Sequence, residues 1–225
     1  MDPRDGPRFA VVDYGAGNLV SIEQALTRVG AQVVVVDRGT VLARTESDAL
    51  VVPGVGAAGP AMDRLAAQDL VRPILDWLGA GRPYLGICLG LQLLFEGSDE
   101  DGAETFGVVA GRTKRLTDAP TLPHIGWNQV DRLTDHRAFT GVAVGADFYF
   151  VHSYAGEPAD DAAVSVLATT THGVPFVSAV ARGELLGVQF HPERSGSDGL
   201  RLLFNVVDHV AGGSTAVSAP SSLLV

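Results

Sequence analysis

Cysteine is almost absent from this chain of 225 residues, which contains only Cys88. A disulfide within the chain is therefore impossible, and a zinc site built on paired cysteines is excluded. Folding needs neither, because a chain of this length can bury most of its apolar surface. The 6 histidines lack the close paired spacing of a zinc site. We therefore expect no metal and no cofactor.

Basic residues are also scarce. The chain has 16 Lys and Arg against 26 Asp and Glu, which gives a formal net charge of −10. The basic residues are scattered, whereas nucleic acids and anionic membranes select clustered Lys and Arg. No apolar run approaches the roughly 20 residues that span a bilayer, and residues 1–5 lack the apolar segment of a signal peptide. The sequence predicts a cytoplasmic protein that binds neither nucleic acid nor membrane.

Short apolar segments alternate with helical patterns through the first half of the chain. Strands are predicted at residues 9–13, 33–36, 49–52 and 84–87, and helices at residues 19–29, 70–78 and 89–95. The strands are continuous in Val, Ala and Leu, which is typical of strands that are buried on both faces. This alternation predicts a parallel sheet with helices on both sides.

The second half consists mainly of short predicted strands separated by Gly, Pro and Asp. They lie at residues 106–116, 124–130, 148–152, 163–170, 176–181 and 185–190, and a helix follows at residues 200–210. Residues 182–184 indicate a hairpin turn. We expect one α/β domain over residues 1–211, in which a mostly parallel sheet carries an antiparallel elaboration. Residues 212–225 are predicted to form a flexible tail.

The segment Gly86-Ile87-Cys88-Leu89-Gly90 joins a predicted strand to a predicted helix. This spacing is that of a nucleophile elbow, in which the reactive side chain lies on a tight turn. Glycine on either side removes the Cβ atoms that would collide at such a turn. The start of a helix favours the thiolate form, and the amide of Leu89 points towards the oxyanion on an attacked carbonyl. Most lone cysteines are buried apolar residues, but this context predicts that Cys88 is a nucleophile.

A thiol nucleophile needs a base, and the segment His191-Pro192-Glu193 supplies the best candidate. His191 directly follows a predicted strand, as Cys88 does, and the sites of open α/β sheets lie at the carboxyl ends of strands. Glu193 can accept the second ring N–H of His191 and stabilise the imidazolium. The histidines at positions 124, 152 and 172 are weaker candidates because they lack an adjacent carboxylate.

Together, these motifs resemble the class I, or triad, glutamine amidotransferases. The resemblance rests on residues 86–92 and 191–193, and it extends over residues 9–210. It implies a flavodoxin-like three-layer sandwich with the activity of a glutaminase. In that family a cysteine attacks the side-chain amide of glutamine, ammonia leaves, and water hydrolyses the thioester. Cys88, His191 and Glu193 match the catalytic triad of the family.

The resemblance also implies the residues around the substrate. Gln92 matches the position that holds glutamine, and residues 53–56 match a loop that contributes to the oxyanion hole. Because glycines flank the peptide at Val55, its orientation is easy to change, which predicts low activity until a partner binds. The implied oxyanion donors are the amides of Val55 and Leu89, and the implied substrate contacts are Gly54, Gly56, Gln92, Ser153 and Tyr154.

One branch of the family matches in five segments, which occur in the same order. They are residues 12–18, 53–56, 123–128, 148–154 and 191–193, and they resemble the glutaminase subunits of imidazole glycerol phosphate synthases. This resemblance implies a heterodimer with a (β/α)₈-barrel cyclase subunit, which receives the ammonia in histidine biosynthesis. It places Asn18, Trp127, Tyr149 and Arg194 at the partner interface. The family usually has lysine at the position of Arg194, and Arg differs from Lys in geometry.

Three alternative functions remain open at this point. The chain could be the glutaminase of another synthase, although residues 123–128 argue against this. It could be a thiol hydrolase that acts alone on γ-glutamyl bonds or peptides, or an inactive regulatory subunit. The complete set of Cys, His and Glu argues against the last of these. Fold analogy does not separate the alternatives, because α/β folds host many kinds of chemistry.

Overall fold

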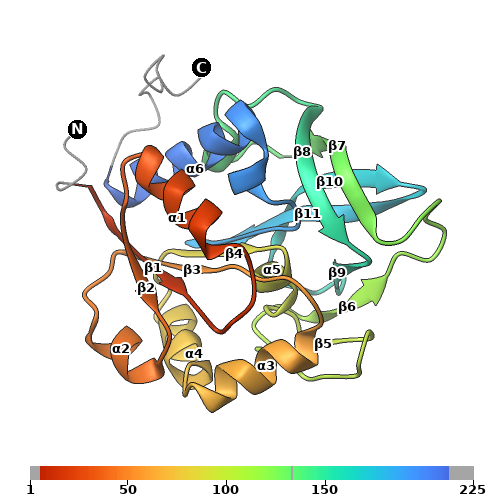
Figure 1. Cartoon of the computed structure of the whole chain (residues 1–225). Helices are drawn as coiled ribbons and strands as arrows, with labels where there is room; N and C mark the ends of the chain where they lie inside the picture. Colours follow the sequence, from red (N-terminus) through yellow and green to blue (C-terminus); the bar gives the residue numbers. More distant parts are fainter. Residues whose placement is uncertain (1–5, 133, 213–225) are drawn as a thin grey trace.

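The computed structural model describes residues 6–132 and 134–212 (Figure 1). Residues 213–225, which make up most of the predicted tail, lie outside the described residues. Within the described part, nine strands form the main sheet in the order β2–β1–β3–β4–β12–β11–β10–β7–β8. Their bounds are β1 Arg8–Val12, β2 Gln32–Val36, β3 Ala49–Val52, β4 Tyr84–Ile87, β7 His124–Arg132, β8 Ala146–His152, β10 Ser165–His172, β11 Val174–Arg182 and β12 Leu185–Val188.

The sheet changes character at β12. Neighbouring strands from β2 to β12 are parallel, whereas those from β12 to β8 are antiparallel. The predicted hairpin at residues 182–184 joins β11 to β12. A second sheet has the order β5–β6–β9, with bounds β5 Gly97–Ser98, β6 Gly111–Arg115 and β9 Tyr154–Pro158. The predicted fold class is confirmed, with this small sheet as an addition.

Helices cover both faces of the parallel half of the sheet (Figure 1). One face carries α1 (Leu19–Arg28) and α6 (Gly196–Val210), and the other carries α2 (Gly39–Arg44), α3 (Ala58–Ala67) and α4 (Val71–Gly79). The remaining helical segments are α5 (Leu89–Gln92) and two 3₁₀ turns, η1 (Arg137–Phe139) and η2 (Pro192–Arg194). This arrangement gives the three layers that the sequence predicts.

Strand β1 explains why the apolar runs are continuous. Its residues Phe9 and Val11 belong to the core under α1 and α6, whereas Ala10 and Val12 belong to the core against α3 and α4. All four residues have an exposed fraction of 0%. Because side chains alternate between the faces of a sheet, a strand between two cores needs an apolar residue at every position.

Some of the predicted elements are wrong. Helices α2 and α3 were not predicted, and neither has a side chain that caps its first turn. The predicted strand at residues 106–116 is a strand only from Gly111 onwards. The amides of Phe106 and Val108 instead donate to the carbonyls of Leu93 and Leu94. The same contacts explain why α5 is shorter than the predicted helix at residues 89–95, since its exit is tied to this loop.

The parallel strands bring the predicted site residues to one edge of the sheet. Cys88 directly follows β4, Gly54 follows β3, and His191 follows β12. Strands β4 and β12 are neighbours, and Ile87 lies opposite Val188. The candidate site therefore lies at the carboxyl ends of β3, β4 and β12, as expected for an open α/β sheet.

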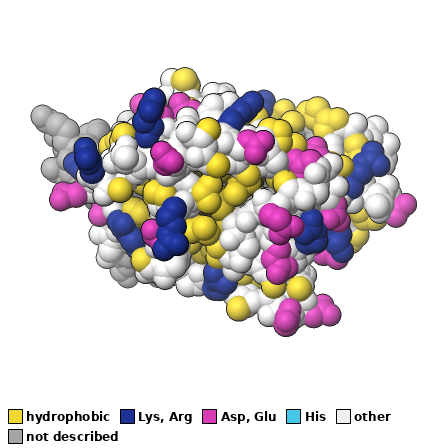
Figure 2. Space-filling view, turned by 90° about the horizontal axis from the view of Figure 1, so that it is seen from below, with side chains coloured by type: hydrophobic (Ala, Val, Ile, Leu, Met, Phe, Trp, Pro, Cys, Tyr) yellow, Lys and Arg dark blue, Asp and Glu magenta, His cyan; other side chains and the backbone are white. Residues whose placement is uncertain are grey.

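Figure 2 shows Lys and Arg side chains scattered among Asp and Glu side chains on one face of the molecule. Within the described residues, no helix is both long enough and apolar enough to cross a membrane.

Candidate active site

Cys88 lies on a strained turn between β4 and α5. Its φ of 53° and ψ of −105° place a non-glycine residue in a left-handed region that side chains rarely adopt. The amide of Cys88 donates to the carbonyl of Val188 at 2.7 Å, which ties the turn to β12. A Cβ atom on Gly86 would lie 2.6 Å from the carbonyl oxygen of Gly90, and one on Gly90 would overlap the carbonyl oxygen of Val52. Both glycines are therefore required by the turn.

The base and its carboxylate lie side by side. His191 Nδ1 and Glu193 Oε1 are 2.8 Å apart, and the two side chains have exposed fractions of 6% and 1%. The main chain holds His191 in place, because its amide donates to the carbonyl of Tyr149 at 2.8 Å. Ser195, which the sequence analysis did not single out, donates through Oγ to the carbonyl of His191 at 2.6 Å. The main chain of His191 is thus fixed at its amide and its carbonyl, and the ring is oriented by Glu193 at Nδ1.

The charge state of His191 is set by its neighbours. Burial by itself lowers the pKa of His191, but attraction to Cys88 and the hydrogen bond and charge of Glu193 raise it to about 10. Among the described residues, Nε2 of His191 has no hydrogen-bond partner. Nε2 is therefore not engaged by another protein group and can exchange a proton. Helix α5 has 4 residues, so the dipole at its start is small.

The two predicted oxyanion donors are not both available in this structure. The amide of Leu89 donates to the carbonyl oxygen of Gly54 at 3.4 Å, so a protein oxygen occupies the place predicted for the oxyanion. A peptide carbonyl and the next amide N–H point in opposite directions. The N–H of Val55 therefore points away from Leu89. Rotation of the single peptide between Gly54 and Val55 would expose both donors.

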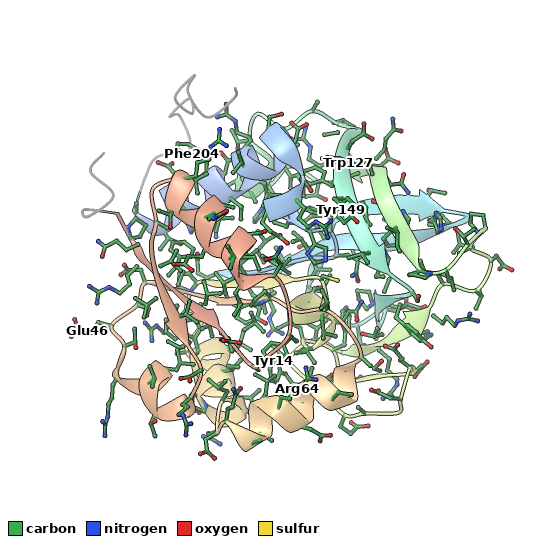
Figure 3. The ribbon with its side chains drawn as sticks, viewed as in Figure 1. Tyr14, Glu46, Arg64, Trp127, Tyr149 and Phe204 are labelled. Carbon is green, nitrogen blue, oxygen red and sulfur yellow. The ribbon has the colours of Figure 1, made fainter. Side chains whose placement is uncertain are left out.

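Tyr14 holds the loop at residues 53–56 through a hydrogen bond. Its hydroxyl donates to the carbonyl of Pro53 at 2.8 Å, and a Cβ atom on Gly54 would overlap it. Burial raises the pKa of Tyr14, and the charge of Cys88 adds to this effect, so the phenol stays protonated as a donor. Arg64 of α3 donates to the carbonyl of Gly15 at 3.2 Å, and Figure 3 shows it beside Tyr14.

A cavity of about 160 Å³ opens beside the sulfur. Four predicted substrate-binding residues line it together with Cys88, and they are Gly56, Gln92, Ser153 and Tyr154. The predicted contact Gly54 does not line it and instead faces Leu89. Gln92 is fixed by a hydrogen bond from Nε2 to the carbonyl of Tyr154 at 2.8 Å.

One carboxylate in this cavity was missed by the sequence analysis. Glu100 lines the cavity, and burial followed by the charge of Asp101 raises its pKa. The signal that could have found it is the acidic segment 99–104, which follows the nucleophile helix at a loop. A lone carboxylate beside a small polar cavity suits a ligand that carries an ammonium group.

The residues predicted at a partner interface lie outside the cavity. Trp127 and Tyr149 are paired across β7 and β8, with ring centroids 6.2 Å apart (Figure 3). The guanidinium of Arg194 lies 3.9 Å from the centroid of the Tyr149 ring. Trp127 is 58% exposed, which makes this cluster available to another protein. Asn18 caps α1 by accepting from the amide of Ser21 at 3.3 Å, and α1 packs against η2.

Comparisons with known proteins agree with this geometry. The family model for glutamine amidotransferase class-I matches residues 10–210. The imidazole glycerol phosphate synthase subunit HisH of Symbiobacterium thermophilum is 46% identical over 201 residues, which cover 88% of this chain and 92% of that protein. The subunit HisH of Mycobacterium leprae is 46% identical over 197 residues, which cover 87% and 94%.

Solved structures show the same fold at much lower identity. A glutamine amidotransferase superposes with a TM-score of 0.70 at 19% identity, covering 90% of this chain and 98% of that one. PurLQS from Thermotoga maritima gives a TM-score of 0.68 at 18% identity, covering 91% and 99%. The structural matches show only the fold, whereas the sequence matches also show the group within the family. The chain belongs to the class-I glutamine amidotransferase family and, within it, to the group of imidazole glycerol phosphate synthase subunits HisH.

Proposed function

We propose that this chain is the glutaminase subunit of an imidazole glycerol phosphate synthase. It hydrolyses L-glutamine to glutamate and ammonia, and it passes the ammonia to a (β/α)₈-barrel cyclase subunit in histidine biosynthesis. The observation that carries the proposal is Cys88 on its strained turn, at the same sheet edge as the His191–Glu193 pair. Its relatives of the HisH group support the choice of synthase. We place the enzyme in the cytoplasm.

The first half of the reaction forms a thioester. The thiolate of Cys88 attacks the side-chain amide carbon of glutamine, a C–S bond forms, and the carbonyl electrons move onto oxygen. The imidazolium of His191 then gives its Nε2 proton to the amide nitrogen, the C–N bond breaks, and ammonia leaves. Glu193 keeps the ring oriented through Nδ1 and stabilises its charged form.

The second half consumes water. His191, now neutral, takes a proton from a water molecule whose oxygen attacks the thioester carbon. A second oxyanion forms and collapses, the C–S bond breaks, and Cys88 leaves as a thiolate. Glutamate is released, and the thiolate–imidazolium pair is restored for the next cycle.

Binding of glutamine uses the cavity beside Cys88. The substrate carries an ammonium group and a carboxylate at its α-carbon, so both charges need partners. Glu100 lines the cavity and suits the ammonium group, and Ser153 and Tyr154, the predicted main-chain contacts of glutamine, line it too. Gln92 braces Tyr154 through its hydrogen bond to the carbonyl of that residue.

The blocked oxyanion hole implies that the isolated chain is a slow enzyme. The carbonyl of Gly54 must leave Leu89 before an oxyanion can be stabilised there. Glycines at positions 54 and 56 allow the peptide to rotate, and Gly56 already has a φ of +96°. A partner that prefers the rotated form would activate the site.

A covalent label tests the nucleophile. A diazo-ketone analogue of glutamine should react with the chain in a one-to-one ratio, and mass spectrometry should place the adduct on Cys88. The Cys88→Ser variant should not react and should lose several orders of magnitude in turnover. A stoichiometric adduct on any other residue would reject the assignment of Cys88.

A further inference from the structure

Gln189 is a buried polar side chain that the triad does not account for. It directly follows β12, has an exposed fraction of 0%, and lies between Cys88 and Gln92. Its Nε2 donates to the sulfur of Cys88 at 3.5 Å, and its Oε1 accepts from Nε2 of Gln92 at 3.0 Å. The main-chain amide of Gln189 donates to the carbonyl of Ser178 at 2.9 Å, which fixes the residue to β11.

The carbonyl of Tyr154 determines the direction of the hydrogen bonds made by Gln92 and Gln189. The carbonyl of Tyr154 can only accept, so the amide group of Gln92 must present its NH₂ towards that oxygen. Its second hydrogen then points to the side-chain oxygen of Gln189. A reversed amide at Gln189 would set two NH₂ groups against each other. The NH₂ group of Gln189 is therefore directed at the sulfur.

We propose that Gln189 is a further catalytic residue, whose amide N–H holds the thiolate of Cys88. This inference rests on the proposed function of Cys88 as the nucleophile. The carbonyl of Val151 lies 3.9 Å from the sulfur and suits the thiol form, because it can accept the thiol proton. Gln189 opposes that preference, because a donor binds a charged sulfur more strongly than a neutral one.

The position of the donor fits both halves of the reaction. The sulfur carries charge before the attack on glutamine and again when the thioester breaks. Nε2 of His191 has no hydrogen-bond partner among the described residues. The amide of Gln189 supplies a directed hydrogen bond from another side and does not change its own protonation.

The pH dependence of alkylation tests the donor without glutamine or a partner. Iodoacetamide reacts with the thiolate, and Cys88 is the only cysteine of the chain. Gln189→Met keeps a similar length but removes the donor. We expect its alkylation profile to move to higher pH by about one unit, with labelling at pH values below the parent's midpoint about tenfold slower. With glutamine as substrate, kcat should fall while KM changes little.

Ser178→Ala is the matched control. Ser178 is as buried as Gln189 and contacts it through the main chain, but its hydroxyl has no hydrogen-bond partner among the described residues. Removing that hydroxyl should leave the alkylation profile unchanged. A Gln189→Met protein that is folded and alkylates like the parent would overturn the proposal.

A second measurement needs no substitution at Gln189. In the parent, the side-chain amide resonance of Gln189 should shift over the same pH range in which Cys88 becomes reactive. In Cys88→Ser that shift should disappear. An amide resonance that ignores the ionisation of Cys88 would also reject the proposal. Failure of the glutamine analogue to label Cys88 would instead reject the proposed function, because alkylation by iodoacetamide reports on the donor alone.

Discussion

At the scale of single residues, His191 shows how neighbours decide the chemistry of a side chain. A buried imidazole is normally neutral, because burial penalises its charged form. Here Cys88 and Glu193 more than offset that penalty and raise the pKa to about 10. A pKa raised this far favours the imidazolium at neutral pH, which is the form that the proposed mechanism needs to protonate the leaving ammonia.

The substitution Glu193→Gln tests whether Glu193 orients and charges His191. Gln keeps the shape but removes one of the groups that raise the pKa of His191, so the alkaline limit of kcat/KM should move to lower pH. The wrong ring tautomer also becomes available. We expect turnover to fall about a hundredfold or more, but less than in His191→Ala. Glutamate release measured across the pH range gives both values.

Glu184→Gln is a matched control for this experiment. Glu184 also pairs with a histidine, since its Oε2 lies 2.7 Å from Nε2 of His209, but it precedes β12 and so lies at the opposite end of that strand from His191. Its substitution should leave turnover unchanged. Full activity in Glu193→Gln would mean that another carboxylate orients His191.

Residues that act through local spacing could be predicted from the sequence, and others could not. Glu193 is two positions from His191, so one short motif predicts both residues. Gln189 and Cys88 are 101 positions apart, and their contact exists only because β12 and β4 are neighbours. The acidic segment 99–104 marks the neighbourhood of Glu100 in the sequence, but only the fold shows that Glu100 lines the cavity.

At the scale of elements, the turn at Cys88 depends on two close backbone approaches. Gly90→Ala would drive a Cβ atom into the carbonyl oxygen of Val52, where the neighbours are main chain and cannot move easily. We expect a loss of about 3 kcal/mol or more in the free energy of unfolding, or no folding at all. Urea unfolding measures this cost.

Gly79→Ala supplies the contrast within the same chain. Gly79 ends α4, and a Cβ atom there would meet nothing within 4 Å. The added methyl group should raise the stability by about 0.5–1 kcal/mol, because it restricts the unfolded chain. Equal effects of the two substitutions would contradict the account of the turn, since both replace glycine by alanine.

At the scale of elements, segments with a clear local pattern of apolar residues were predicted well. The other segments take a structure that depends on tertiary contacts. Strands β3 and β4 match their predicted bounds, because they are bounded apolar runs. The apolar run at residues 106–110 looks like a strand in the sequence. Instead, Phe106 and Val109 are buried, and their amides donate to the carbonyls of Leu93 and Leu94, which directly follow α5. No local pattern distinguishes such a loop from a strand.

At the scale of the whole molecule, the site joins segments that lie far apart in the sequence. The parallel half provides Cys88 and the oxyanion loop, and β12 returns to the sheet to place His191 beside them. The antiparallel half adds Tyr149, which binds the main chain of His191 and stacks under Arg194. Tyr149 of β8 thus contacts both Arg194, which belongs to the predicted partner face, and the main chain of His191, the predicted base.

This arrangement gives a partner two ways to affect the candidate site. A partner that contacts Tyr149 could shift the main chain of His191, which is hydrogen-bonded to Tyr149. The other is direct, because the side chain of Val55 is 44% exposed on the loop whose peptide must rotate. A barrel subunit that covers Val55 and Trp127 can prefer the rotated loop, and only such a preference can activate the enzyme.

We therefore expect three different rates of glutamate release. The isolated chain should be slowest, the complex with the cyclase faster, and the complex loaded with the cyclase ligand fastest. Each oxyanion donor contributes about a hundredfold or more, so the total increase should reach at least that size. Because coupling is reciprocal, glutamine bound to a Cys88→Ala chain should also tighten binding of the cyclase. Three equal rates would show that Leu89 and Val55 are already available in the free chain, contrary to the contact between Leu89 and Gly54.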